Sequence, residues 1–165
     1  FVFTDPLSQL VMPTGREDVE LSLRRSIRNA AERRARAESV LERFGLLPLA
    51  DQSIYELSGG ERQLLSLAAV LAVDPEVLVL DEPSTLLDLR NRELLRRTLA
   101  GLRQQVILST HDLDLARDMD RVLVVDAGNV VFDGEPAAAV AHYRALSAAG
   151  LPSAGGPAGG RLEQA

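Results

Sequence analysis

Hydrophobic positions along this chain follow a helical period in some segments and form unbroken runs in others. One predicted helix carries apolar residues at i, i+3, i+4 and i+7, namely Ala37, Val40, Leu41 and Phe44. Gly45 follows these positions and supplies a stop signal. An earlier helix is predicted over residues 17–29, because acidic residues begin it and arginines lie toward its end, as the helix dipole favours.

Two unbroken apolar runs predict neighbouring strands. Residues 77–80 read Val-Leu-Val-Leu without a polar break, which predicts a strand that is buried on both faces and ends at Asp81. Residues 105–108 predict a second short strand. A helix is expected between them over residues 91–102.

The C-terminal part of the chain predicts a hairpin, a helix and a tail. Valine-rich runs at residues 121–126 and 129–132 flank an Ala-Gly pair, which is typical of a hairpin. Pro136 opens a helix that extends to about residue 148, since proline is favoured in a first helical turn. Residues 150–165 are rich in Gly, Pro and Ala, and we expect a disordered tail there.

Composition excludes several classes of protein. With 165 residues and 46% hydrophobic content, the chain has enough apolar surface for one domain core. It has no cysteine, so disulfides and thiolate metal sites are excluded. The net charge is −6 and the basic residues are scattered, which argues against a nucleic-acid partner. The longest nearly apolar run, residues 64–73, is about half of what a bilayer span requires.

Candidate chemistry lies in two short stretches. The strand that ends at Asp81 continues with Glu82, so it delivers two carboxylates to the carboxyl edge of a sheet, where open α/β sheets bind ligands. Upstream, Ser58 and Glu61 have the spacing of a capping box around a glycine pair. A helix that begins there presents free N–H groups, which form an anion site.

Three motifs in this order and at this spacing resemble the ATP-binding subunit of ABC transporters. They are LSGGERQ at residues 57–63, VLVLDEP at residues 77–83 and STHD at residues 109–112. In that family they are the signature motif, Walker B and the switch histidine. The resemblance covers about residues 1–148. It implies an α/β fold, a mainly parallel sheet of the P-loop NTPase type with a helical insertion.

The resemblance also implies how the chain is divided. Residues 1–12 correspond to the Q-loop region and residues 13–56 to the helical subdomain. Residues 57–149 form the catalytic α/β part, and residues 150–165 form the tail. All 18 basic residues are arginine, so the family's P-loop, which requires a lysine, has no counterpart here. We therefore expect a chain that is incomplete at its N-terminus and binds no ATP by itself.

The family's functional roles can be carried over to matching residues. Asp81 would hold Mg²⁺, Glu82 would act as general base on the attacking water, and His111 would contact the γ-phosphate of ATP. The signature residues would contact a nucleotide that is held by a second ATPase subunit in a head-to-tail homo- or heterodimer; these are Ser58, Gly59, Gly60 and Gln63.

Two loop positions complete the expected site. Asp88 matches the D-loop aspartate, which contacts the opposing subunit, and it is also placed to cap the helix that follows. Thr4 occupies the position of the usual Q-loop glutamine, and its hydroxyl has a shorter reach. The sequences Phe-Thr-Asp-Pro at residues 3–6 and Val-Met-Pro-Thr at residues 11–14 are similar to those of the energy-coupling-factor branch of the family. This resemblance implies an importer of a vitamin or metal ion such as biotin or cobalt.

Such a subunit would lie on the cytoplasmic face of the membrane, with a transmembrane coupling subunit and a substrate-binding membrane subunit as partners and no nucleic acid. The run of arginines between residues 24 and 36 predicts a solvated face, and docking to the membrane subunit is the alternative. Two other functions stay open. One is a non-transport ABC ATPase of the DNA-repair or Fe–S assembly type, of which the absence of a heptad run disfavours the first. The other is a non-catalytic partner that lends only its signature motif, which the retained Glu82 and His111 disfavour.

Overall fold

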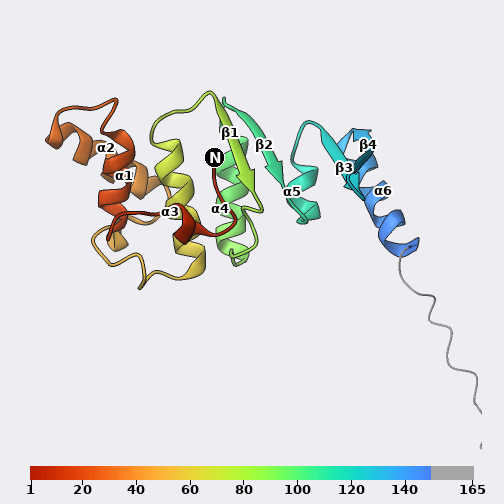
Figure 1. Cartoon of the computed structure of the whole chain (residues 1–165), viewed down its shortest axis with the longest axis horizontal. Helices are drawn as coiled ribbons and strands as arrows, with labels where there is room; N and C mark the ends of the chain where they lie inside the picture. The colour runs from red at the N-terminus through yellow and green to blue at the C-terminus, as the bar shows by residue number, and fades with distance from the viewer. Residues whose placement is uncertain (150–165) are drawn as a thin grey trace, which may run out of the picture. The chain divides into compact units, whose positions relative to one another are not determined.

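The computed structural model describes residues 1–149, and the predicted tail lies outside the described residues (Figure 1). The chain divides into two compact units, Phe1–Asp118 and Met119–Ala165, and each is described separately below. Within residues 1–149, no helix combines the length and hydropathy that a membrane span requires.

The first unit is built on a small parallel sheet. Strand β1 (Val77–Asp81) pairs in register with β2 (Gln105–Ser109), so that Asp81 lies opposite Ser109. The N-terminal segment runs parallel to β1 on its other side: Val2 N–H donates to the Val79 carbonyl at 2.8 Å, and its carbonyl accepts from Asp81 N–H at 2.9 Å. The two predicted strands are confirmed.

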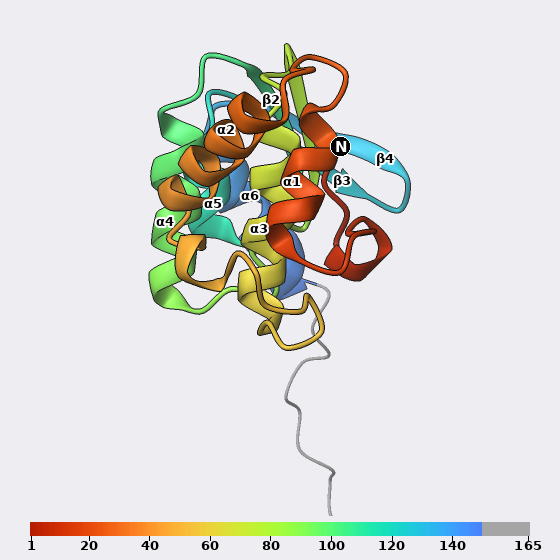
Figure 2. The ribbon, with the colours of Figure 1, turned by 90° about the vertical axis from the view of Figure 1, so that its left-hand side faces the viewer.

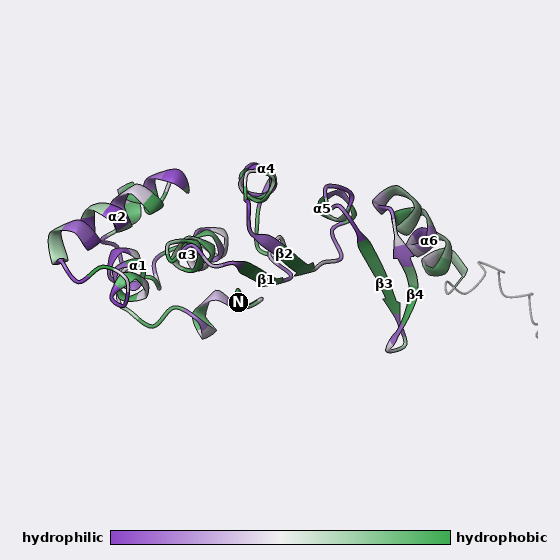
Figure 3. Ribbon diagram, turned by 90° about the horizontal axis from the view of Figure 1, so that it is seen from above, coloured by the Kyte–Doolittle hydropathy of each residue, from purple (hydrophilic) through white to green (hydrophobic). Residues whose placement is uncertain are grey.

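Helices cover one face of this sheet and leave the other open. Helix α3 (Gly59–Leu71) and helix α4 (Leu89–Ala100) lie on the same side of β1 and β2 (Figure 3). On that side Leu78 and Leu80 are 0% and 1% exposed. The opposite face carries side chains that are 45–55% exposed: Phe1, Phe3, Val77 and Ile107.

The prediction that β1 is buried on both faces is therefore wrong. Val77 is 45% exposed and Val79 is half-buried, whereas their neighbours Leu78 and Leu80 are fully buried. The reason is that successive side chains of a strand point to opposite faces, and no helix in the described part of this unit packs on the second one.

A helical region precedes α3. It consists of a short 3-10 turn, η1 (Pro6–Ser8), then α1 (Gly15–Leu23), α2 (Ala30–Arg43) and a second turn, η2 (Leu47–Leu49). Figure 2 shows α1 and α2 beside α3. The four apolar residues that predicted α2 and its end are all buried, and Gly45 ends the helix with a φ of +68°. A one-turn helix, α5 (Leu113–Arg117), ends the first unit.

The predicted helix at residues 17–29 is shorter than expected. Helix α1 ends at Leu23, and Asn29 begins the next helix instead of ending this one, because its side chain accepts from Glu32 N–H at 3.1 Å. Between the two helices, an Arg33 guanidinium N–H donates to the carbonyl of Ile27 at 3.2 Å. Five of the six arginines in this region are exposed: Arg24, Arg25, Arg28, Arg34 and Arg36.

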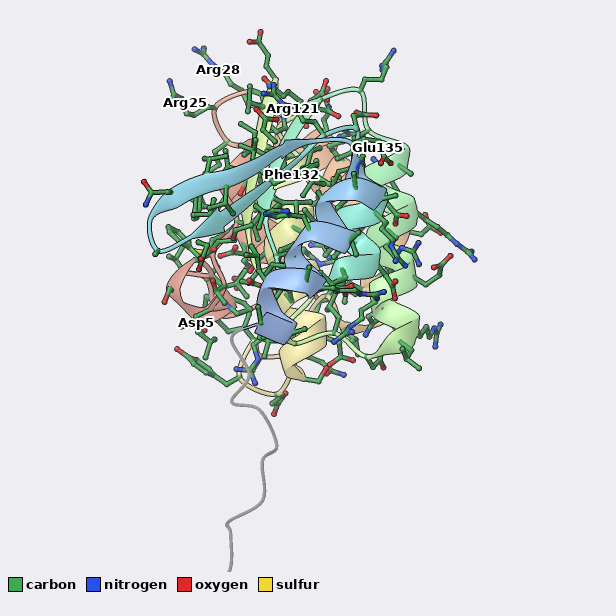
Figure 4. The ribbon with its side chains drawn as sticks, turned by 90° about the vertical axis from the view of Figure 1, so that its right-hand side faces the viewer. Asp5, Arg25, Arg28, Arg121, Phe132 and Glu135 are labelled. Atoms are coloured by element: carbon green, nitrogen blue, oxygen red, sulfur yellow. The ribbon has the colours of Figure 1, made fainter. Side chains whose placement is uncertain are left out.

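The second unit is a hairpin packed against one helix. Strands β3 (Val122–Asp126) and β4 (Asn129–Gly134) pair antiparallel around Ala127 and Gly128, which have φ values of +45° and +79°. Helix α6 (Pro136–Ala149) follows, and the ring centroids of Phe132 and His142 lie 5.3 Å apart. Figure 4 shows the hairpin beside α6, with Phe132 labelled. The predicted hairpin and helix are confirmed.

Candidate functional site

The carboxylate of Asp81 is held by two hydroxyl groups. The Ser109 hydroxyl donates to Oδ1 at 2.6 Å, and the Thr4 hydroxyl donates to Oδ2 at 2.5 Å. Hydrogen bonds to a carboxylate favour its charged form. Ser109 first, and then Thr4, therefore lower the pKa of Asp81 below its ordinary value. The result is an ionised, oriented carboxylate at the carboxyl end of β1.

Glu82 forms a pair with His111 at the same edge. The His111 Nδ1 atom lies 2.7 Å from Glu82 Oε2, and the side chains are 67% and 26% exposed, respectively. Glu82 has a φ of +49°, a left-handed conformation that is uncommon for a residue other than glycine and often marks a functional site. A carboxylate that contacts an imidazole and remains accessible to water has the arrangement of a general base.

The oxygen atoms at this edge suit one class of metal ion. Among residues 1–149, no group of three or more His, Cys, Asp or Glu side chains forms a ready-made metal cage. Mg²⁺ is commonly bound by one or two carboxylates together with substrate phosphates and water. The Asp81 carboxylate, with the Thr4 hydroxyl beside it, fits that mode of binding.

The signature turn, residues 58–61, begins α3 as the sequence predicted. The Ser58 hydroxyl accepts from Glu61 N–H at 3.3 Å, and the Glu61 carboxylate accepts from Ser58 N–H at 2.7 Å, which completes the capping box. A Cβ on Gly60 would lie 3.3 Å from the Leu86 carbonyl oxygen. A side chain at this position would require the Leu86 carbonyl to shift, so Gly60 favours the close approach of the helix to the loop that follows β1.

Gln63 is buried in the described part of the chain. Its side chain is 3% exposed, and neither its amide nitrogen nor its amide oxygen has a hydrogen-bond partner in the described residues. Gln63 follows Gly60 by one helical turn on the same face of α3, and it lines a small gap beside Pro83 and Leu87. The expected contact with a nucleotide on a second subunit stays a prediction, and it would require the side chain to leave this buried position.

Asp88 caps the next helix. Its carboxylate accepts from Asn91 N–H at 2.8 Å, so α4 begins at Leu89, two residues earlier than predicted. The side chain is exposed. The capping role is confirmed, whereas the contact with an opposing subunit stays a prediction.

The structure thus brings together four predicted residues from three segments: Thr4, Asp81, Glu82 and His111. Two polar residues that sequence reasoning missed also contribute. Ser109 contacts Asp81, and the side chain of Gln9 links Phe3 N–H to the Ser66 carbonyl of α3, at 3.2 Å each. The signal for Ser109 was its place at the end of the second strand, directly opposite Asp81 in a parallel pair. No comparable signal existed for Gln9.

Comparison with protein families supports the motif reading. The family model described as "ABC transporter" matches residues 7–85. The biotin transport ATP-binding protein BioM of Rhizobium etli is 45% identical over 148 residues, which are 90% of this chain and 66% of that protein. The energy-coupling factor transporter ATP-binding protein EcfA1 of Latilactobacillus sakei is 33% identical over 91% of this chain and 55% of its own length. The chain therefore spans less than two thirds of the length of either relative.

Solved structures agree in fold. A dimeric ATP-binding cassette in a post-hydrolysis state with ADP and phosphate matches with a TM-score of 0.76 and 30% identity, over 82% of this chain and 62% of that one. The cbiO1 protein of Clostridium perfringens, part of the ABC transporter complex cbiONQ, matches with a TM-score of 0.73 and 31% identity, over 89% and 61%. The predicted α/β fold class is confirmed.

Proposed function

This chain belongs to the ABC transporter family, and we propose that it forms part of an ATP-binding subunit that hydrolyses ATP to power a membrane importer. The observation that carries the proposal is the acidic edge of β1. There a hydroxyl-bound Asp81 stands next to a Glu82–His111 pair, all at the carboxyl end of a parallel strand. This is where parallel α/β sheets bind their ligands.

In the proposed reaction each residue of the edge has a separate task. Asp81 would hold Mg²⁺, which would neutralise charge on the phosphates. Glu82 accepts a proton from the attacking water, since its carboxylate is accessible and already oriented by His111. The His111 Nδ1 atom contacts Glu82, which leaves Nε2 for a second hydrogen bond; we assign that bond to the γ-phosphate.

The signature turn acts on a nucleotide bound by another subunit. The 165 residues contain no lysine, so the phosphate-binding P-loop is not among them. The Ser58–Gly59–Gly60 turn nevertheless presents a helix N-terminus that is capped and partly exposed. We infer a head-to-tail dimer in which this turn contacts the γ-phosphate across the interface, and the dimeric cassette matched above supports this arrangement.

The relatives support a proposal for the transported substrate. Two similar proteins are a biotin transport subunit and an energy-coupling factor subunit. A vitamin or metal-ion importer is therefore the proposed complex, with biotin as the first substrate to test. Its further partners are a transmembrane coupling subunit and a substrate-binding membrane subunit, with this chain peripheral on the cytoplasmic face.

A single substitution at the signature turn tests the proposal in the full-length gene product. Ser58→Arg fills the space that a γ-phosphate needs, so ATP-dependent dimerisation should be lost while the nucleotide affinity of the monomer stays within about twofold, because a trans site contributes nothing to the monomer. Light scattering and nucleotide titration measure the two quantities. Ser39→Arg, at an exposed position of α2, is the matched control. A large loss of monomer affinity would assign the turn to the same subunit's nucleotide and contradict the dimer.

A further inference from the structure

Among the hydrogen bonds of the described residues, Ser109 is the residue that contacts both Asp81 and Glu82, through the carboxylate of Asp81 and the backbone N–H of Glu82. We propose that Ser109 is a positioning residue for ATP hydrolysis, which sets the orientation of the metal-binding Asp81 and the backbone of the catalytic Glu82 at the same time. This inference rests on the proposed function.

The contact with Asp81 fixes one carboxylate oxygen. Ser109 and Asp81 lie directly opposite each other in the parallel pair β1–β2, and the hydroxyl donates to Oδ1 at 2.6 Å. Thr4 occupies the other oxygen from the opposite side of β1. With both oxygens engaged, rotation of the carboxylate about its Cβ–Cγ bond breaks at least one hydrogen bond. Partners that orient a metal ligand in this way influence metal affinity.

The contact with Glu82 involves the backbone. Glu82 N–H donates to the Ser109 carbonyl at 3.1 Å and lies 3.3 Å from the Ser109 hydroxyl oxygen, which accepts a share of the same proton. This N–H belongs to the residue with a φ of +49°. The Ser109 hydroxyl therefore joins two consecutive residues of the edge, as a donor to one and an acceptor from the next.

The position of Ser109 argues for a task beyond holding the sheet together. It is the last residue of β2 and is exposed, so its hydroxyl could be solvated by water without loss. The ladder bond from Glu82 N–H to its carbonyl needs no side chain. Ser109 also lies two residues before His111. The end of β2 therefore supplies both the hydroxyl that contacts Asp81 and the imidazole that contacts Glu82.

The test separates the hydroxyl from the shape of the side chain. Ser109→Thr keeps the hydroxyl and Ser109→Val replaces it with a methyl group of the same size, and both are β-branched residues that suit a strand. In the full-length gene product, Mn²⁺ is titrated in the presence of a non-hydrolysable ATP analogue, and free Mn²⁺ is followed by electron paramagnetic resonance. We expect Ser109→Val to weaken Mn²⁺ binding about tenfold. The Mn²⁺ affinity of Ser109→Thr should stay within about twofold of that of the parent protein.

Two measurements keep the outcome specific. Ser8→Ala removes a hydroxyl that donates to the carboxylate of Asp5 at 2.8 Å, a matched contact outside the edge, and should leave Mn²⁺ affinity unchanged. Metal-free nucleotide affinity should be the same in all variants. Equal Mn²⁺ affinity of the Thr and Val variants overturns the role of Ser109 while the proposed function stands. A parent protein that binds no Mn²⁺–nucleotide complex overturns the proposed function together with the inference.

Discussion

The signature turn and the acidic edge are held together in different ways. The turn closes on itself through reciprocal hydrogen bonds between Ser58 and Glu61, three residues apart. The edge joins residues that are distant in sequence: the Thr4–Asp81 hydrogen bond spans 77 residues, and the Ser109–Asp81 bond spans 28. One region is therefore encoded locally, whereas the other exists only after three segments have paired.

This difference has a consequence for how the site responds to damage. A local capping box forms wherever its helix forms, and helix formation depends mainly on nearby residues and on packing. The acidic edge depends on the register of β1 with β2 and with the N-terminal segment. We therefore expect changes in the sheet to disturb the edge more than the turn.

The largest effect is expected in the core beneath the edge. Leu80→Ala removes a side chain that is 1% exposed, and the cavity should lower the free energy of unfolding by about 2–5 kcal/mol. Ile107→Ala, at a position that is 52% exposed, should cost less than about 1 kcal/mol. Urea unfolding measures both. Equal losses would show that the two faces of the sheet do not differ as described.

The second effect is on catalysis in the full-length gene product. Glu82→Gln should retain ATP binding and reduce the rate of hydrolysis by about 100-fold, because an amide accepts no proton from water. Steady-state ATPase assays measure it, and the closed dimer should accumulate with ATP. Glu76→Gln, an exposed glutamate just before β1, is the control. Near-normal turnover of the Glu82 variant would remove this residue from its proposed role.

The third effect is local to the turn. Ser58→Ala should reduce the free energy of unfolding by about 1 kcal/mol through loss of the helix cap. Amide chemical shifts near Asp81 should not change, because the edge receives no hydrogen bond from the turn among the described contacts. Ser39→Ala is the control. Widespread shifts at the edge would break the distinction between local and distant contacts.

The smallest effect is the pH dependence of stability in metal-free buffer. The hydrogen bonds from Ser109 and Thr4 lower the pKa of Asp81 in the folded state. The unfolded chain then binds the proton more readily, so this carboxylate stabilises the fold above its unfolded pKa of about 3.9 and the contribution is lost as the pH falls through the folded pKa. The stability difference between the parent chain and Asp81→Asn should therefore shrink below about pH 4. If the stability difference between the two proteins stays constant from neutral pH to about pH 3, the assigned lowering of the Asp81 pKa is wrong.

The parts of the structure that could be predicted are those with local causes. The capping box at Ser58, the stop at Gly45 and the hairpin at Ala127–Gly128 all depend on residues within a few positions of each other. The wrong end of the helix predicted over residues 17–29 also had a visible local signal: Asn29 is followed three positions later by Glu32, which is the pattern of a helix start rather than a helix end.

The parts that could not be predicted depend on what packs against a residue. An apolar strand does not reveal whether one or both of its faces are covered, so the exposure of Val77 was missed. Gln63 shared a motif with Ser58, but the face of α3 on which it lies points to Leu87 and the core. The hydrogen bonds of Thr4 and Ser109 with Asp81 required the pairing of three segments, which no single motif contains.

The close approach at Gly60 has a mechanical consequence. A Cβ on Gly60 would lie 3.3 Å from the carbonyl oxygen of Leu86. The backbone of α3 therefore faces this carbonyl with no side chain of residue 60 between them. Leu86 follows the edge residue Glu82 by four positions and precedes Asp88 by two. We therefore expect a displacement of this loop to move the first turn of α3 as well, which would couple the hydrolysis edge to the surface that we propose contacts a neighbouring subunit.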